Sequence, residues 1–213
     1  MSDNLGYAFN WLGSKLGSYT IHVVPNKLPQ KVASAFDELF GEMVGAQYGL
    51  IAYLGSKVVS GTNHAILATQ TMITGNDVHN VVLIVLNEKD DKFSIVEITN
   101  ILSDSGKLGG VQVAPTTDIP EEAMEVFNKN FDGFLGSKVV PFALLGTQVV
   151  NGAKYIFAAE TEMVVSPKAM EKGNYGKVVM IGVYSNYDKI EFSDIIEGVP
   201  SQGLLGMPLG EWP

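Results

Sequence analysis

The chain has 213 residues, of which 46% are apolar and 17% are charged, and its formal net charge is -9. The fourteen basic residues are all lysines, and neither arginine nor cysteine occurs. This charge repels phosphate backbones and anionic lipids, so neither nucleic acid nor a membrane is an expected partner. Without thiols, the chain has no disulfides, thiolate nucleophiles or Cys-ligated metals.

The N-terminus has neither the positive start nor the apolar core of a signal peptide. No run approaches the roughly 18 apolar residues of a membrane span. We therefore expect a soluble, cytoplasmic protein. Apolar residues recur at helical spacing within residues 1–17, which predicts a short amphipathic segment there; they are Leu5, Phe9, Leu12 and Leu16.

After this segment, the pattern predicts the same elements twice. Each half begins with a short strand, continues with a proline and an amphipathic helix, and ends with four strands. In the first half the strands are expected at 19–24, 48–54, 62–71, 81–86 and 93–98, with the helix after Pro29. In the second half they are expected at 111–114, 139–145, 153–164, 178–184 and 190–195, with the helix after Pro120.

Self-comparison of the sequence supports a duplication. Residues 29–70 align without a gap on 120–161 at an offset of 91, with eleven identical pairs among 42 positions. Past a longer loop in the second half, 80–98 aligns on 177–195. The identical segments Leu54–Val59 and Leu135–Val140, at an offset of 81, match nothing on either side, and we treat them as coincidence.

These patterns predict an α+β protein with two central repeats, 18–106 and 107–200, between an N-terminal segment 1–17 and an apolar C-terminal tail 201–213. Each repeat is expected to fold as one helix packed on a four- to five-stranded antiparallel sheet, with its own modest core. The tail contains Leu204, Leu205 and Trp212. We expect it to pack on its own chain or on a neighbouring copy.

In each half, the turn after the first strand that follows the helix resembles a known motif. The turn Gln148-Val149-Val150-Asn151-Gly152 resembles the Gln-Val-Val-x-Gly hairpin of the cystatins. The turn Lys57-Val58-Val59-Ser60-Gly61 resembles the same segment in their cysteine-free stefin branch, with lysine in place of glutamine. Leu108-Gly109-Gly110 resembles the glycine-bearing trunk of secreted cystatins. The turns Asn87–Asp91 and Ser185–Asp188 stand where the family has the Pro-Trp of its second binding hairpin.

Cystatins inhibit papain-like cysteine peptidases without covalent chemistry, because their trunk and hairpin loops fill the active-site cleft. The resemblance spans about residues 18–198 and implies two tandem cystatin-like modules with such a peptidase as partner. It places the peptidase-binding residues in the two valine turns and at Gly109 and Gly110, and it implies no catalytic residue and no cofactor. Glycine permits a tight turn and close backbone approach, and paired valines offer apolar area to a cleft.

Two other interpretations stay open. The valine turns are also consistent with a purely structural role, in which case the protein is a non-inhibitory interaction module that forms homo-oligomers through its apolar ends. An enzyme ranks third, because no nucleophile elbow, P-loop or dinucleotide motif occurs. The three histidines, His22, His64 and His79, are predicted to be packed or surface strand residues, and no metal site is expected.

Overall fold

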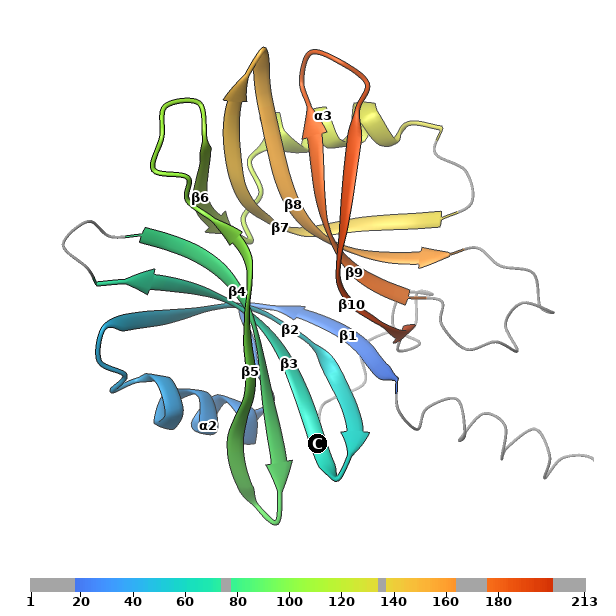
Figure 1. Cartoon of the computed structure of the whole chain (residues 1–213). Coiled ribbons are helices and arrows are strands. Elements are labelled where there is room, and N and C mark those ends of the chain that lie inside the picture. The colour runs from blue at the N-terminus through green and yellow to red at the C-terminus, as the bar shows by residue number, and fades with distance from the viewer. Residues whose placement is uncertain (1–17, 74–77, 134–136, 164–175, 201–213) are drawn as a thin grey trace, which may run out of the picture.

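The computed structural model describes residues 18–73, 78–133, 137–163 and 176–200, so the predictions for 1–17 and 201–213 lie outside the described residues. The described residues form one ten-stranded sheet and two helices (Figure 1). The elements are β1 (Tyr19–Pro25), α2 (Gln30–Phe40), β2 (Ala46–Val59), β3 (Gly61–Met72), β4 (Val78–Lys89), β5 (Lys92–Ser103), β6 (Val111–Thr116), α3 (Glu121–Phe131), β7 (Ser137–Val150), β8 (Gly152–Met163), β9 (Gly176–Tyr184) and β10 (Ile190–Pro200).

The strand order is β5-β4-β3-β2-β1-β10-β9-β8-β7-β6, so the halves of the chain meet where β1 pairs with β10. That junction is parallel, with Tyr19 opposite Gly198 and Ile21 opposite Pro200, whereas the other neighbours within the sheet are antiparallel. The two edge strands, β5 and β6, follow each other in the chain, and in the loop between them Ser105 donates its backbone N–H to the carbonyl of Val111 at 3.1 Å.

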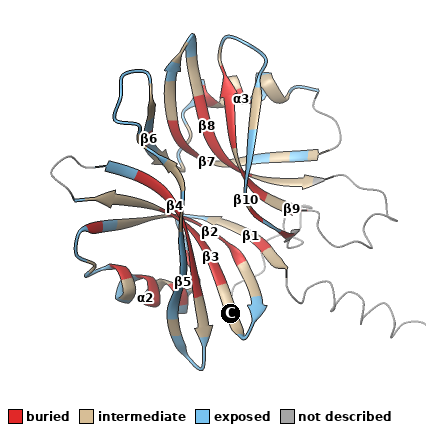
Figure 2. Cartoon of the chain, in the orientation of Figure 1, coloured by how far each residue is buried: buried red, intermediate tan, exposed pale blue. Residues whose placement is uncertain are grey.

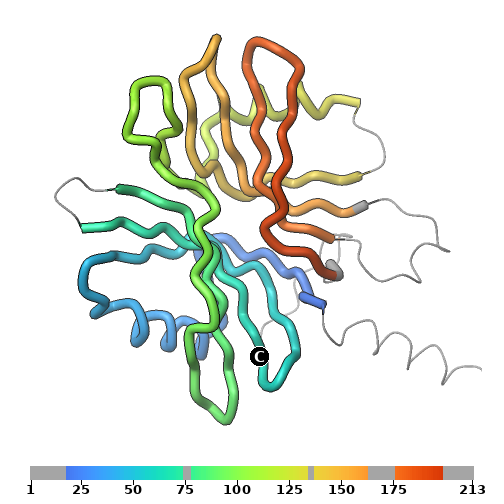
Figure 3. The backbone as a smooth tube through the Cα atoms, in the orientation of Figure 1, coloured from blue at the N-terminus to red at the C-terminus, as the bar shows by residue number. Residues whose placement is uncertain are grey.

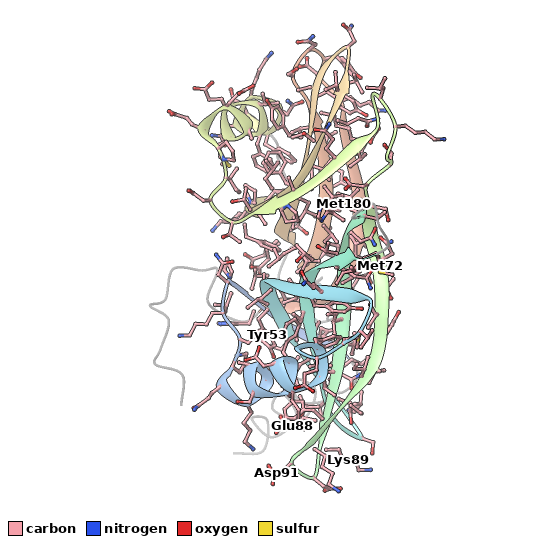
Figure 4. All side chains as sticks on the ribbon, turned by 90° about the vertical axis from the view of Figure 1, so that its left-hand side faces the viewer. Tyr53, Met72, Glu88, Lys89, Asp91 and Met180 are labelled. Atoms are coloured by element: carbon pink, nitrogen blue, oxygen red, sulfur yellow. The ribbon has the colours of Figure 1, made fainter. Side chains whose placement is uncertain are left out.

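Each helix begins directly after a proline and lays one apolar stripe on the sheet. Pro29 and Pro120 are the N-cap residues, and a proline at a helix start removes no helical hydrogen bond. In α2 the buried residues include Val32, Phe36 and Phe40, which pack on β2, β3 and β4. Seen from the side, both helices lie to the left of the strands (Figure 4). None of the helices described is long and apolar enough to span a membrane.

The two halves share a single core on the face of the sheet that the helices leave uncovered. Leu54, Leu67 and Val85 from the first half belong to the same buried cluster as Leu145 and Ile156 from the second. Figure 2 shows buried segments in the middle of the strands of both halves. Burial of this face therefore depends on both halves.

The expectation of two tandem helix-on-sheet modules, each with its own core, is wrong. One ten-stranded mixed sheet runs through both halves. The physical reason is visible in β4, where Val81–Leu86 is buried on both faces. Val82, Ile84 and Leu86 pack in the cluster beneath α2, and their alternate neighbours pack in the shared core. One helix covers only one face of a sheet, so the second apolar face must be buried by the other half.

The offset of 91 residues seen in the sequence recurs in the geometry. Adding 91 to the bounds of α2, β2 and β3 gives those of α3, β7 and β8. The register of β2 with β3 shifts between Leu50 and Ala52, and that of β7 with β8 shifts between Pro141 and Ala143. Asn26 donates a side-chain hydrogen bond to Thr117, which is the residue 91 positions later. Contact between equivalent positions is what an approximate two-fold axis between the halves produces.

Candidate functional site

The turn between β7 and β8 requires a glycine at its tightest point. Gly152 has a φ of 99°, a conformation that side chains other than glycine rarely adopt. A Cβ atom there would lie 2.5 Å from the side-chain nitrogen of Asn186 and 2.7 Å from the hydroxyl of Ser185. The β9–β10 turn is therefore packed directly against the β7–β8 turn.

Two further hydrogen bonds join these turns. Ser185 accepts the backbone N–H of Ala153 at its hydroxyl, 2.9 Å away, and donates its own backbone N–H to the Ala153 carbonyl, also at 2.9 Å. On the other flank, Gln148 donates from its side-chain amide to the carbonyl of Gly109 at 3.0 Å. The loop between β5 and β6 is thus tied to the β7–β8 turn as well.

A chain of contacts also orients Tyr187 in the β9–β10 turn. Its ring stacks on that of Tyr184 with the ring centres 4.6 Å apart. The Tyr184 hydroxyl donates to the Glu191 carboxylate at 2.9 Å, and Lys154 donates to the same carboxylate at 2.5 Å. The ammonium groups of Lys154 and Lys189 hold the pKa of Glu191 at about 2, so this carboxylate is ionised at neutral pH.

Together these three segments make up the second-half loop end, defined as residues 104–110, 148–153 and 185–189. Their tips lie side by side at the top of the molecule (Figures 1 and 3). Apolar side chains project from each tip: Leu108 is fully exposed, Val149 is 70% exposed and Tyr187 is 41% exposed. Three exposed apolar side chains on linked loops are typical of a protein-binding surface.

The other predicted turn lies at the opposite end of the molecule (Figure 3). This first-half loop end is defined as the β2–β3 turn, 57–61, and the β4–β5 turn, 87–92. Val58 is 57% exposed and Val59 is 41% exposed. The Lys89 ammonium lies 3.2 Å from the Ser60 hydroxyl, so these two turns are also linked. The predicted residues therefore form two separate groups, with Gly109 and Gly110 beside Gln148–Gly152 and apart from Lys57–Gly61.

The histidines take the packed and surface positions predicted for strand residues. His64 is buried in β3, with Nδ1 3.0 Å from the Tyr53 hydroxyl and Nε2 3.2 Å from the Glu88 carboxylate. His22 is half-buried and His79 is exposed. Within the ranges that the structure describes, no group of three or more His, Asp or Glu side chains is placed to hold a metal ion.

Sequence reasoning assigned no binding role to Tyr187 or Ser185, although it aligned their turn with the second binding hairpin of the cystatins. The available signal was an aromatic residue at the tip of a polar turn, which is a common anchor in protein interfaces. The contact between this turn and Gly152 spans 34 residues of sequence and has no local signature. A scan against protein-family models finds no match for this chain, and a search of curated proteins finds none either.

Proposed function

We propose that this protein binds a papain-like cysteine peptidase without covalent chemistry, with the second-half loop end entering the active-site cleft. The observation that carries the proposal is the linkage of three loops, each with an exposed apolar tip, by the hydrogen bonds of Gln148 and Ser185. The resemblance of Gln148–Gly152 to the cystatin hairpin supports the choice of partner.

The physical argument is preorganisation. A loop that is already held in its binding conformation loses little conformational entropy when it binds, so more of its contact energy appears as affinity. Gly152 brings two turns together, and the Tyr184–Glu191 contact holds the platform on which Tyr187 stacks. No reactive group is needed, because inhibition follows from filling the cleft.

The first test is an inhibition titration of papain with the intact chain and with Val149→Asp. Placing a carboxylate at the tip should weaken inhibition at least about 30-fold, which corresponds to the roughly 2 kcal/mol of an interface hot spot. Val44→Asp is the matched control, because Val44 is 97% exposed and belongs to neither loop end. It should inhibit like the parent protein.

Absence of inhibition by the parent protein at micromolar concentration would contradict the proposal. Equal weakening by Val149→Asp and Val44→Asp would contradict the placement of the site. Gly152→Glu provides a second variant at the same turn, and its folding is checked by circular dichroism because Gly152 has a positive φ.

A second candidate function is assembly through the apolar terminal segments, without inhibition. The observation that favours it is the parallel pairing of β1 with β10, since these strands connect directly to residues 1–17 and 201–213. The two apolar ends therefore join the sheet on neighbouring strands. Light scattering of the full chain and of a variant lacking 201–213 tests this function, which requires an oligomer that the deletion reduces to a monomer.

A further inference from the structure

The molecule carries two exposed valine turns, and they differ from each other in chemistry and not only in position. At the second-half loop end the tips are the apolar or aromatic residues Leu108, Val149 and Tyr187, with exposed charges only beside them, at Lys107, Asp188 and Lys189. At the first-half loop end, Val58 and Val59 stand beside a β4–β5 turn whose tip is Lys89-Asp90-Asp91-Lys92. Asp90 and Asp91 both have positive φ values, 52° and 55°, which are typical of a tight two-residue hairpin turn.

The turns of the first-half loop end are also held together by contacts, as in the second-half loop end. Gly61 has a φ of 100°, and a Cβ atom there would lie 2.3 Å from the backbone carbonyl of Glu88. Asn87 donates to the Asn63 side chain at 2.7 Å. From α2, Lys31 forms ion pairs with Asp91 at 2.9 Å and Glu88 at 3.5 Å. The helix, the β4–β5 turn and the β2–β3 turn therefore form one connected unit.

The approximate two-fold axis directs the two loop ends away from each other. The Asn26–Thr117 contact joins equivalent residues across that axis. The β2–β3 and β7–β8 turns lie at the bottom and top of the molecule in the tube view (Figure 3). A partner seated on one loop end therefore does not cover the other.

From this geometry we propose that the chain holds two peptidase molecules at once, one on each loop end, which rests on the proposed function. The first-half loop end recognises a cleft with a charged rim, because Lys89 contacts Ser60 next to the exposed valines and Asp90 lies at the tip of the same β4–β5 turn. The second-half loop end recognises a more apolar one, because Leu108, Val149 and Tyr187 are its exposed tips. Binding at the first-half loop end is consequently more sensitive to salt, since ions screen exposed charges and leave apolar contacts largely unchanged.

The experiment measures the mass of complexes between the chain and an excess of papain by light scattering with size-exclusion chromatography, with the catalytic cysteine of papain replaced by alanine so that the cleft stays open. The parent protein and Val44→Asp should bind two papain molecules per chain. Val58→Asp and Val149→Asp should each bind one, and the double variant none. Val58 and Val149 are equivalent positions at an offset of 91, so the same substitution tests both ends. Lys89→Ala removes the contact with Ser60 and should weaken binding at the first-half loop end alone, so this variant should lose one of its two papain molecules at a higher papain concentration than the parent protein does.

The salt dependence of binding distinguishes the two sites. Raising the salt from about 0.05 M to about 0.5 M shortens the screening length from above 10 Å to below 5 Å. At the higher salt, papain bound to Val149→Asp, which occupies the first-half loop end, should be lost at a higher papain concentration than papain bound to Val58→Asp. A stoichiometry of one papain per chain, unchanged by Val58→Asp, would overturn the two-site inference and leave the proposed function standing. Absence of any complex would overturn both.

Discussion

At the residue scale, position 64 and its equivalent, position 155, show how the two halves have diverged. His64 contacts Tyr53 and Glu88, which ties β3 to β2 and β4. Tyr155 instead donates its hydroxyl to Glu122 of α3 at 2.5 Å, so the same strand position binds the helix in the second half. The Glu122 carboxylate raises the pKa of Tyr155 to about 12, and this hydroxyl stays protonated at neutral pH.

The buried histidine predicts a pH-dependent stability. Burial lowers the pKa of His64, and Glu88 acts in the opposite direction without reversing the shift. The unfolded chain therefore takes up this proton at higher pH than the folded chain. The stability that the protein gains from keeping His64 neutral is fully present above about pH 6.5. Below that pH the free energy of unfolding decreases by at most about 1.4 kcal/mol per pH unit.

Urea unfolding at about pH 7.5 and about pH 5.5 measures this decrease. His64→Phe removes the titrating group and should show a smaller difference between the two pH values. Some difference should remain, because burial also lowers the pKa of His22. An identical difference in the parent and in His64→Phe would show that His64 does not titrate differently in the folded and unfolded chains.

At the scale of elements, the strands extend beyond their apolar centres. The pattern predicted a strand at 48–54, whereas β2 continues to Val59. Of the added residues, Gly55 to Lys57 are small or polar, and in the sequence such residues are typical of a turn. They pair with Ala65, His64 and Asn63 of β3 through the backbone, and backbone pairing does not need apolar side chains. The same extension occurs in β7, which continues to Val150, so both hairpins are longer than the pattern predicted.

The equivalence of the two helices predicts matched effects of mutation. Phe127 of α3 is 3% exposed, with its ring centre 4.4 Å from that of Phe131 and 5.2 Å from that of Phe157. Phe127→Ala should lower the free energy of unfolding by about 3–5 kcal/mol, as deletion of a buried aromatic ring does. Phe36→Ala, 91 positions earlier in α2, should have a similar cost.

Urea denaturation provides the measurement for both variants. Val44→Ala is the control, because truncating this fully exposed side chain should change the free energy of unfolding by less than about 0.5 kcal/mol. A loss below about 1 kcal/mol for Phe127→Ala would mean that α3 contributes little to the packing of the sheet.

At the scale of the whole molecule, the shared core makes the two halves depend on each other. Leu54 and Leu145 are both fully buried and lie in one cluster. Separation would expose the inner face of each half, and water penalises a large contiguous apolar face. The approximate two-fold axis also means that two copies of one half present the surfaces needed to cover each other.

Fragments 1–106 and 107–213 test this dependence. Neither should persist as a folded monomer. Each should form a dimer of itself or aggregate, and the mixture should regain the cooperative unfolding of the intact chain. Size-exclusion chromatography with circular dichroism makes the measurement. A monomeric fragment that unfolds cooperatively would show that each half has a sufficient core of its own.

The sequence alone determined the order of the elements, the 91-residue offset and the positions of the two glycine turns, because these depend on local patterns and on proline and glycine chemistry. It also identified Gln148–Gly152 and Gly109 as candidate residues, although their contact appears only in the structure. The tertiary structure decided how the halves combine. Every β4 residue from Val81 to Leu86 is apolar, and a continuous run does not say which neighbour covers its second face. That neighbour is the other half of the same chain. The sequence could not show this, because Tyr19 and Gly198, which pair where the halves meet, are far apart in the chain and no local pattern encodes their pairing.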